Sequence, residues 1–244
     1  MKSTACALPL THRTLGDIVT DDARAGAVLS RFGLDFCCGG HQTLGDAAAR
    51  RQVPLGVIVE ALDALAASVP VAAPQWPELD ALTRHIVTAH HGYVREITPT
   101  LTAWLDKLVT RHGERHPELA AVRNVFARLS DELAVHMVKE ENVLFPYIDE
   151  LARAARGIGR LPASPFGTVL NPVRAMEHDH RDAGEALARL RDLTSDFSPP
   201  ADACVTYQLC FGELERFEID LKTHVHLENH VLFPGVIELE QRMI

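Results

Sequence analysis

Hydrophobic residues in the later two-thirds of the chain recur every three or four positions, the spacing of amphipathic helices. This pattern extends over four long segments, at about 78–112, 118–155, 172–195 and 202–233. Stretches containing glycine and proline separate the segments, and the apolar–polar alternation typical of strands is absent from the sequence. Long amphipathic helices joined by short or moderate loops favour an antiparallel four-helix bundle.

The first part of the chain carries shorter helical patterns, at about 23–31, 43–51 and 55–67. The segment 69–77, VPVAAPQWP, contains three prolines and is typical of a stiff linker between domains. We therefore predict an all-α protein in three parts. These are a small helical N-terminal domain (1–68), a proline-rich linker (69–77) and the four-helix bundle (78–244).

Charge and apolar content narrow the classes of function. Lysine and arginine number 24 against 33 acidic residues, a net charge of −9, which argues against binding nucleic acid or an anionic membrane. The most apolar stretch, 55–73, is interrupted by Glu60, Asp63 and Pro70, so we expect no membrane span. The first residues lack the apolar core of a signal peptide, and five cysteines is an odd number for a disulfide scaffold. The expected location is the cytoplasm.

An internal repeat with an offset of 88 residues carries the candidate chemistry. LAVHMVKEENVLFPYIDEL (133–151) and LKTHVHLENHVLFPGVIEL (221–239) are identical at nine of 19 positions. Each copy contains His-x-x-x-Glu, as His136 with Glu140 and as His224 with Glu228. A spacing of four places both side chains on one helix face, and the leucines on that face direct it into the bundle. A buried glutamate is costly unless it is paired or bound to a metal.

The other helix of each predicted hairpin supplies a histidine. His180 lies on an apolar stripe, and the matching position on the first helix is His91, at an offset of 89. The periodicity alone also allows His90, although the repeat favours His91. A lone pair of this kind is most often a surface pair, but its recurrence in both halves favours a metal site. The predicted ligands are four imidazoles and two carboxylates, namely His91, His136, Glu140, His180, His224 and Glu228.

Mixed imidazole and carboxylate ligands suit iron better than manganese or zinc, and two glutamates near a pseudo-two-fold axis suit bridging between two metals. Glu132 and Asp220 lie one turn before the ligand histidines of the two repeats. We expect them either to orient those histidines and guide iron, or to be ordinary helix charges.

Two sets of motifs resemble a known family. HMVKEENVLFP, HVHLENHVLFP and AMEHDH (175–180) resemble the hemerythrin-like His–Glu bundle, and LDFCCGGHQTL (34–44) resembles the signature of the N-terminal domain of the repair-of-iron-centres family. The resemblance covers about 10–68 and 78–240. It implies a bacterial di-iron protein that restores iron–sulfur clusters damaged by nitric oxide or oxidants. The family's ligands fall on the same six residues that the repeat predicts.

The resemblance also implies partners and a cofactor. The cofactor would be two irons per chain, bridged by carboxylates and an oxo group; damaged iron–sulfur proteins would be the clients, and NO or O₂ the small ligands. Alternative functions are an NO-binding sensor or scavenger, or an NO reductase, so the sequence leaves open whether the protein is an enzyme. It also leaves open the oligomeric state, which includes a homodimer. Oxygen-carrying hemerythrins have a further histidine where this chain has Gly184, which argues against simple dioxygen carriage.

Cys37 and Cys38 are followed by two glycines, which allow close backbone approach. Thiolates there would be stabilised if the loop caps a helix beginning near Thr43. On their own these cysteines are more typical of a partly buried pair in a turn. The family resemblance instead implies a redox-active or iron-handling pair. Cys6, Cys204 and Cys210 have no such context.

Overall fold

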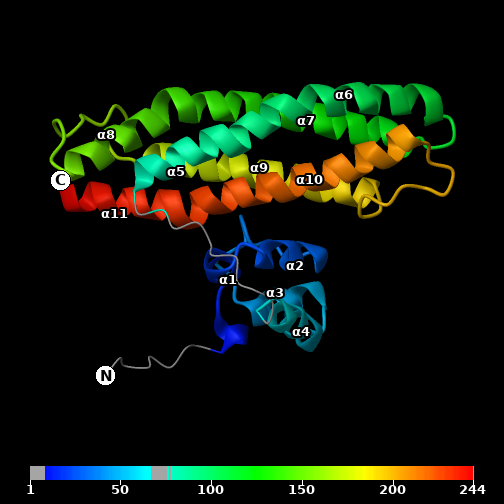
Figure 1. Ribbon diagram of the computed structural model, residues 1–244, viewed down its shortest axis with the longest axis horizontal. Helices are drawn as coiled ribbons and strands as arrows, with labels where there is room; N and C mark the ends of the chain where they lie inside the picture. Colours follow the sequence, from blue (N-terminus) through cyan, green and yellow to red (C-terminus); the bar gives the residue numbers. More distant parts are fainter. Residues whose placement is uncertain (1–8, 67–75, 77, 244) are drawn as a thin grey trace. The chain divides into compact units, whose positions relative to one another are not determined.

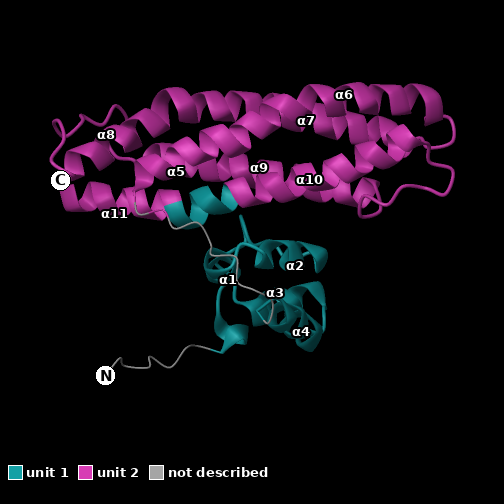
Figure 2. Ribbon diagram, in the orientation of Figure 1, with its two compact units in different colours: residues 1–75, 225–231 teal, residues 76–224, 232–244 magenta. Residues whose placement is uncertain are grey.

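The computed structural model describes residues 9–66, 76 and 78–243. Every regular element in these residues is helical, apart from one isolated bridge between Thr14 and Thr43, so the predicted all-α class is confirmed. The chain divides into two compact units, residues 1–75 with 225–231 and residues 76–224 with 232–244 (Figure 2). Nearly all of the predicted linker 69–77 lies outside the described residues. The predicted domain boundaries stay a prediction.

The second unit begins with a helical hairpin. Its first arm is α5(Leu79–His85), a π-helical turn η2(Ile86–His91) and α6(Gly92–His112). Its second arm is α7(Glu118–Lys139), a π-helical turn η3(Glu140–Leu144) and α8(Phe145–Ala155). Helix α7 packs on α6, and α8 packs on α5, so the two arms run alongside each other (Figure 1).

The repeat of this hairpin follows. Helix α9(Leu170–Leu193) packs on α7, and α10(Val205–Leu227) leads through a third π-helical turn, η4(Glu228–Leu232), into α11(Phe233–Met243). Helix α11 packs on α8. Leucines and aromatic rings fill the interior, with Phe126 and Phe217 in edge-to-face contact at 5.4 Å.

The fourth helical segment does not end near residue 233, where the sequence pattern ended it. In both repeats the chain passes through a π-helical turn and continues as α8 or α11. Pro146 and Pro234 occupy the first turn of the new helix, where the missing N–H costs little. The π-helical turns begin at Glu140 and Glu228. Such turns insert a residue into the helix and occur frequently at functional sites.

A buried glutamate secures the start of α9. The Glu240 carboxylate accepts hydrogen bonds from Val169 N at 3.0 Å, Thr168 Oγ1 at 2.7 Å and Tyr147 Oη at 2.7 Å. It thereby satisfies a backbone donor that a helix N-terminus leaves without an intrahelical partner. In the described residues no helix is long and apolar enough to cross a membrane.

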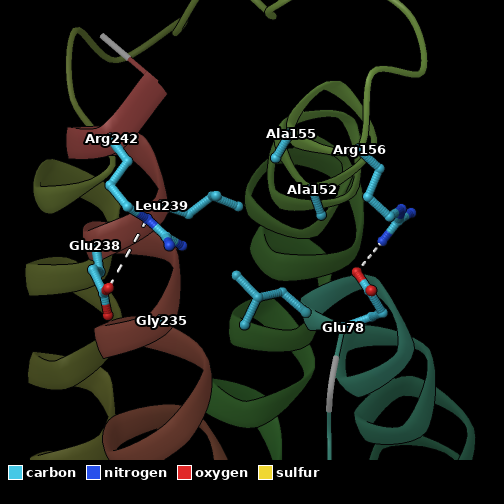
Figure 3. Close-up of a pocket in the computed structure, with 9 residues that line it drawn as sticks. Glu78, Ala152, Ala155, Arg156, Gly235, Glu238, Leu239 and Arg242 are labelled. Carbon is cyan, nitrogen blue, oxygen red and sulfur yellow. Dashed lines mark hydrogen bonds and ion pairs between the residues drawn. The ribbon is translucent and has the colours of Figure 1, made fainter.

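A pocket of about 300 Å³ opens beside α5, α8 and α11 (Figure 3). Its apolar lining includes Leu79, Ala152 and Leu239, and ion pairs lie at its edge, such as Arg156 with Glu78. Arg156 also binds Asp80, with both oxygens of that carboxylate 3.0 Å from the guanidinium. None of the predicted metal ligands lines this pocket.

In the described part of residues 9–66, the first unit has a short 3-10 helix, η1(Leu10–His12), and the α-helices α1(Leu15–Asp21), α2(Ala25–Arg31), α3(Leu44–Arg51) and α4(Leu55–Ala66). The sequence patterns predicted the last three and missed α1. The side chains of Thr14 and Thr43 accept hydrogen bonds from Asp17 N and Asp46 N, which caps α1 and α3. The loop between α2 and α3 carries the two adjacent cysteines.

Candidate metal centre

Two groups of buried side chains form the candidate metal centre. The first comprises His91, Glu140, His224 and Glu228; the second comprises His136, Glu140, His180 and Glu228. Within each group the potential ligand atoms all lie within 4.8 Å of one another. All six predicted ligands are therefore members, and both glutamates belong to both groups. Shared carboxylates are the geometry required to bridge two metal ions.

The distances between individual atoms define the centre more closely. Glu140 Oε2 lies 3.3 Å from His91 Nε2 and 3.2 Å from His136 Nε2. His91 Nε2 also lies 3.3 Å from His224 Nε2, and His136 Nε2 lies 3.3 Å from His180 Nε2. The Nε2 atoms of two imidazoles thus converge in each group, and Glu140 faces both groups.

Phenylalanine rings of the two VLFP motifs back two of the histidines. His91 stacks on Phe145 with ring centroids 5.9 Å apart, and His180 stacks on Phe233 at 5.9 Å. These rings restrict how the imidazoles can turn and keep water from their outer faces. The repeated phenylalanine therefore has the same packing role in both halves.

Two further carboxylates contact the outer nitrogens of the histidines. His91 Nδ1 lies 2.6 Å from Glu141 Oε1, and the same oxygen accepts from Arg95 Nη2 at 2.6 Å. Burial raises the pKa of Glu141, but the hydrogen bonds from His91 and Arg95 outweigh burial and hold the pKa below its ordinary value. Glu141 is therefore ionised at neutral pH.

On the opposite group, His136 Nδ1 lies 3.3 Å from Asp179 Oδ2, which also accepts from Lys139 Nζ at 2.9 Å. The hydrogen bond with His136 is the main reason that the pKa of Asp179 is far below its ordinary value; Lys139 adds to it, and burial opposes it. Asp179 is ionised as well.

The chemistry of this arrangement fits a bound cation. An ionised carboxylate only accepts hydrogen bonds, so His91 and His136 donate through Nδ1–H, and in a neutral imidazole Nε2 then carries the lone pair. Both lone pairs face the Glu140 carboxylate, which is fully buried. Two hydrogen-bond acceptors that face each other in a buried site repel. A cation placed between the Nε2 lone pairs and the carboxylate would make each of these contacts favourable.

His90, the alternative ligand, belongs to neither group. Its Nδ1 lies 2.9 Å from Asp220 Oδ1, and its ring stacks on His224 with centroids 5.7 Å apart. Asp220 therefore lies beside His90, which in turn stacks on a member of the first group. Glu132 is exposed and 3.8 Å from Arg128, so its structural role is that of an ordinary helix charge.

Sequence reasoning missed Glu141 and Asp179. Each is adjacent in sequence to a ligand, Glu141 after Glu140 and Asp179 before His180. The sequence feature that could have identified them is a carboxylate directly adjacent to a candidate ligand. That position lies off the inward face of its own helix, and the carboxylate therefore reaches the imidazole of a different helix.

The cysteine loop forms a separate cluster around Asp35. The Asp35 carboxylate accepts hydrogen bonds from the backbone N–H groups of Cys37, Cys38 and Gly39 at 3.0–3.1 Å. It also accepts from Cys37 Sγ at 3.1 Å. Within the same unit, the Cys37 carbonyl accepts from Asn229 Nδ2 at 3.2 Å. The loop is therefore held by many hydrogen bonds.

The surroundings of Cys37 favour its thiol form over the thiolate, and the proposed redox or iron-handling role of the pair stays a prediction. The pKa of Cys37 is well above its ordinary value. The hydrogen bond with Cys38 is the largest cause of this rise, and burial and the negative charge of Asp35 add to it. The two sulfur atoms are 3.9 Å apart and are not bonded as a disulfide. Cys38 is partly exposed and is the more accessible thiol. Asp35, Cys37 and Cys38 form a third group that could hold a metal ion.

Comparison with known proteins agrees with this geometry. Residues 82–236 match the hemerythrin HHE cation binding domain, and residues 11–66 match a domain of unknown function, DUF542. The iron-sulfur cluster repair protein YtfE of Musicola paradisiaca is 35% identical over 231 residues, which cover 94% of this chain and 98% of that protein. The chain belongs to this iron-sulfur cluster repair family.

Other members of the family are similar to the chain over nearly its whole length. The YtfE proteins of Dickeya chrysanthemi and Cronobacter sakazakii are 32% and 34% identical, and each match covers 93% of this chain and 97–98% of the relative. The predicted family is thus confirmed. The hemerythrin match and the buried His–Glu groups together show a domain built to bind a cation.

Proposed function

We propose that this protein binds two irons and uses them to restore iron–sulfur clusters damaged by nitric oxide or oxidants. The observation that carries the proposal is the pair of buried two-histidine, two-glutamate groups that share both carboxylates. The relatives, which are named iron-sulfur cluster repair proteins, support the assignment of the process. We expect the protein to work in the cytoplasm, on damaged iron–sulfur proteins as clients.

Each iron would take two imidazoles and share Glu140 and Glu228, with the oxo bridge that the family resemblance implies. Bound iron supplies both the cargo for a damaged cluster and a position for a small ligand such as NO. The residues of the chain hold the donors in place: Glu141 and Asp179 keep Nδ1 of their histidines protonated and direct Nε2 inward. Mixed nitrogen and oxygen ligands suit iron in either common oxidation state.

The cysteine loop is proposed to handle the iron or the redox state of the client. Cys38 is the accessible thiol, and Asp35 holds the loop in one conformation by accepting its backbone N–H groups. A buried thiol beside an accessible one offers a soft donor pair for iron that leaves an imidazole–carboxylate site. This assignment gives the small N-terminal domain a role that a simple NO scavenger would not need.

A direct test incubates the iron-loaded protein with an iron–sulfur enzyme that NO has inactivated. Labelled iron should appear in the client, and client activity should return in proportion. His136→Ala with His224→Ala, which removes one ligand from each group, should abolish both effects, whereas Glu150→Gln on the exposed surface should not. Recovery that is equally fast with the double variant would refute the proposal. Repeated turnover of NO to N₂O with an electron donor, without client recovery, would favour an NO reductase instead.

A further inference from the structure

The two groups of the metal centre differ in the carboxylates that support their histidines. In the first group, His91 Nδ1 and Glu141 Oε1 are 2.6 Å apart. In the second group, His136 Nδ1 and Asp179 Oδ2 are 3.3 Å apart. A charge-assisted N–H···O bond is strongest near 2.7–2.9 Å, so the first contact is close and the second lies at the outer limit.

The cations that hold the two carboxylates differ in the same direction. Arg95 Nη2 is 2.6 Å from Glu141 Oε1, and Lys139 Nζ is 2.9 Å from Asp179 Oδ2. A guanidinium is planar and keeps its orientation, whereas an ammonium on a flexible stem does not. Glu141 is therefore the more firmly placed of the two carboxylates.

The internal repeat does not reproduce this support. The position 88 residues after Glu141 is Asn229, a neutral amide that donates to the Cys37 carbonyl in the first unit. The position 89 residues before Asp179 is His90, an imidazole. The ligands are duplicated, but the groups around them are not, and a duplicated ligand set with unequal surroundings gives two unequal metal positions.

We propose that the two positions retain iron with unequal strength. The position between His91 and His224 keeps its iron, because Glu141, held by Arg95, fixes His91 and strengthens its donor nitrogen. The position between His136 and His180 gives up its iron first and is the exchangeable one. This inference rests on the proposed di-iron function and adds which iron is delivered. Glu141 is a positioning residue, since it acts through His91.

The experiment measures iron release from the full-length protein. Protein loaded with two ferrous ions per chain is mixed anaerobically with excess ferrozine, and formation of the coloured complex is followed in time. We expect two phases of equal amplitude. Glu141→Gln keeps the size of the side chain and removes its charge, and it should accelerate the slow phase about 10–100-fold, the usual effect of losing such a partner. The fast phase should be unchanged.

Matched variants separate this from a general loss of structure. Asp179→Asn should accelerate only the fast phase, and Arg95→Gln should accelerate the slow phase by less than Glu141→Gln does. Glu150→Gln, an exposed change on α8, should alter neither phase. Mössbauer spectra of ⁵⁷Fe-loaded Glu141→Gln should show a change in one of two iron signals, which a merely structural defect would not produce.

Release in a single phase, or a slow phase that responds to Asp179→Asn and not to Glu141→Gln, would overturn the inference. The repair assay is independent of this result. Two-phase release without recovery of any damaged client would refute the proposed function and leave the inequality standing. Single-phase release with full client recovery would refute the inequality of the two positions and leave the proposed function standing.

Discussion

Replacing His91 with alanine tests the ligand assignment at the position where the sequence was ambiguous. His91 is fully buried on the π-helical turn, with Nε2 3.3 Å from Glu140 and 3.3 Å from His224. The alanine variant removes one of four donors from one metal position. Its neighbour His90 lies in the same turn, belongs to neither group of potential ligands, and stacks on His224. The pair His91→Ala and His90→Ala is therefore a matched comparison.

The magnitude follows from the number of ligands. Structural sites with four protein ligands bind a divalent metal with about 10–16 kcal/mol, or roughly 2.5–4 kcal/mol per ligand. Loss of His91 should therefore weaken that position roughly 10²–10³-fold. Loss of His90 removes a neighbour of a ligand, for which about 10-fold is expected.

The assay is iron content after gel filtration against a range of chelator concentrations, together with the optical spectrum of the oxidised protein. His91→Ala should fall toward one iron per chain at a chelator concentration where the wild type keeps two, and His90→Ala should stay near two. Circular dichroism confirms that both variants fold. If His90→Ala loses iron as readily as His91→Ala, or more readily, the repeat register is off by one residue on the first helix.

Three further predictions concern the domains and the stability of the bundle. The fragment 78–244 should fold and bind two irons, as measured by metal analysis; a fragment that folds without iron would contradict this. The double variant Cys37→Ser, Cys38→Ser should keep its iron content and helical signal but should fail to restore a damaged client. Full repair by this variant would show that the two cysteines are only part of a turn and have no role in repair. The contact with Arg156 is the main reason that the pKa of Asp80 is lowered from 3.8 to about 2. The stability it contributes is present above pH 4 and lost as the pH falls toward 2, so urea titrations of wild type and Arg156→Met should converge over that range.

The sequence alone predicted the helical class, the bundle and the set of six ligands. Helical periodicity is a local property, and a spacing of four residues places His136 beside Glu140 on one face whatever the rest of the chain does. The duplication then supplied His224 and Glu228 in the same arrangement. An unpaired surface motif would have had no reason to keep histidine and glutamate in both copies.

The tertiary structure decided the contacts between helices. Glu141 and Asp179 reach imidazoles on other helices, and no spacing within one helix reports such a contact. Helix α1, which sequence reasoning missed, is held by the Thr14 side-chain cap and by burial of Leu15, Ile18 and Val19. The protonation of Cys37 depends on its burial and on the neighbouring Cys38 and Asp35 side chains. The sequence therefore determined which side chains share a helix face, and packing determined which groups from different helices meet there.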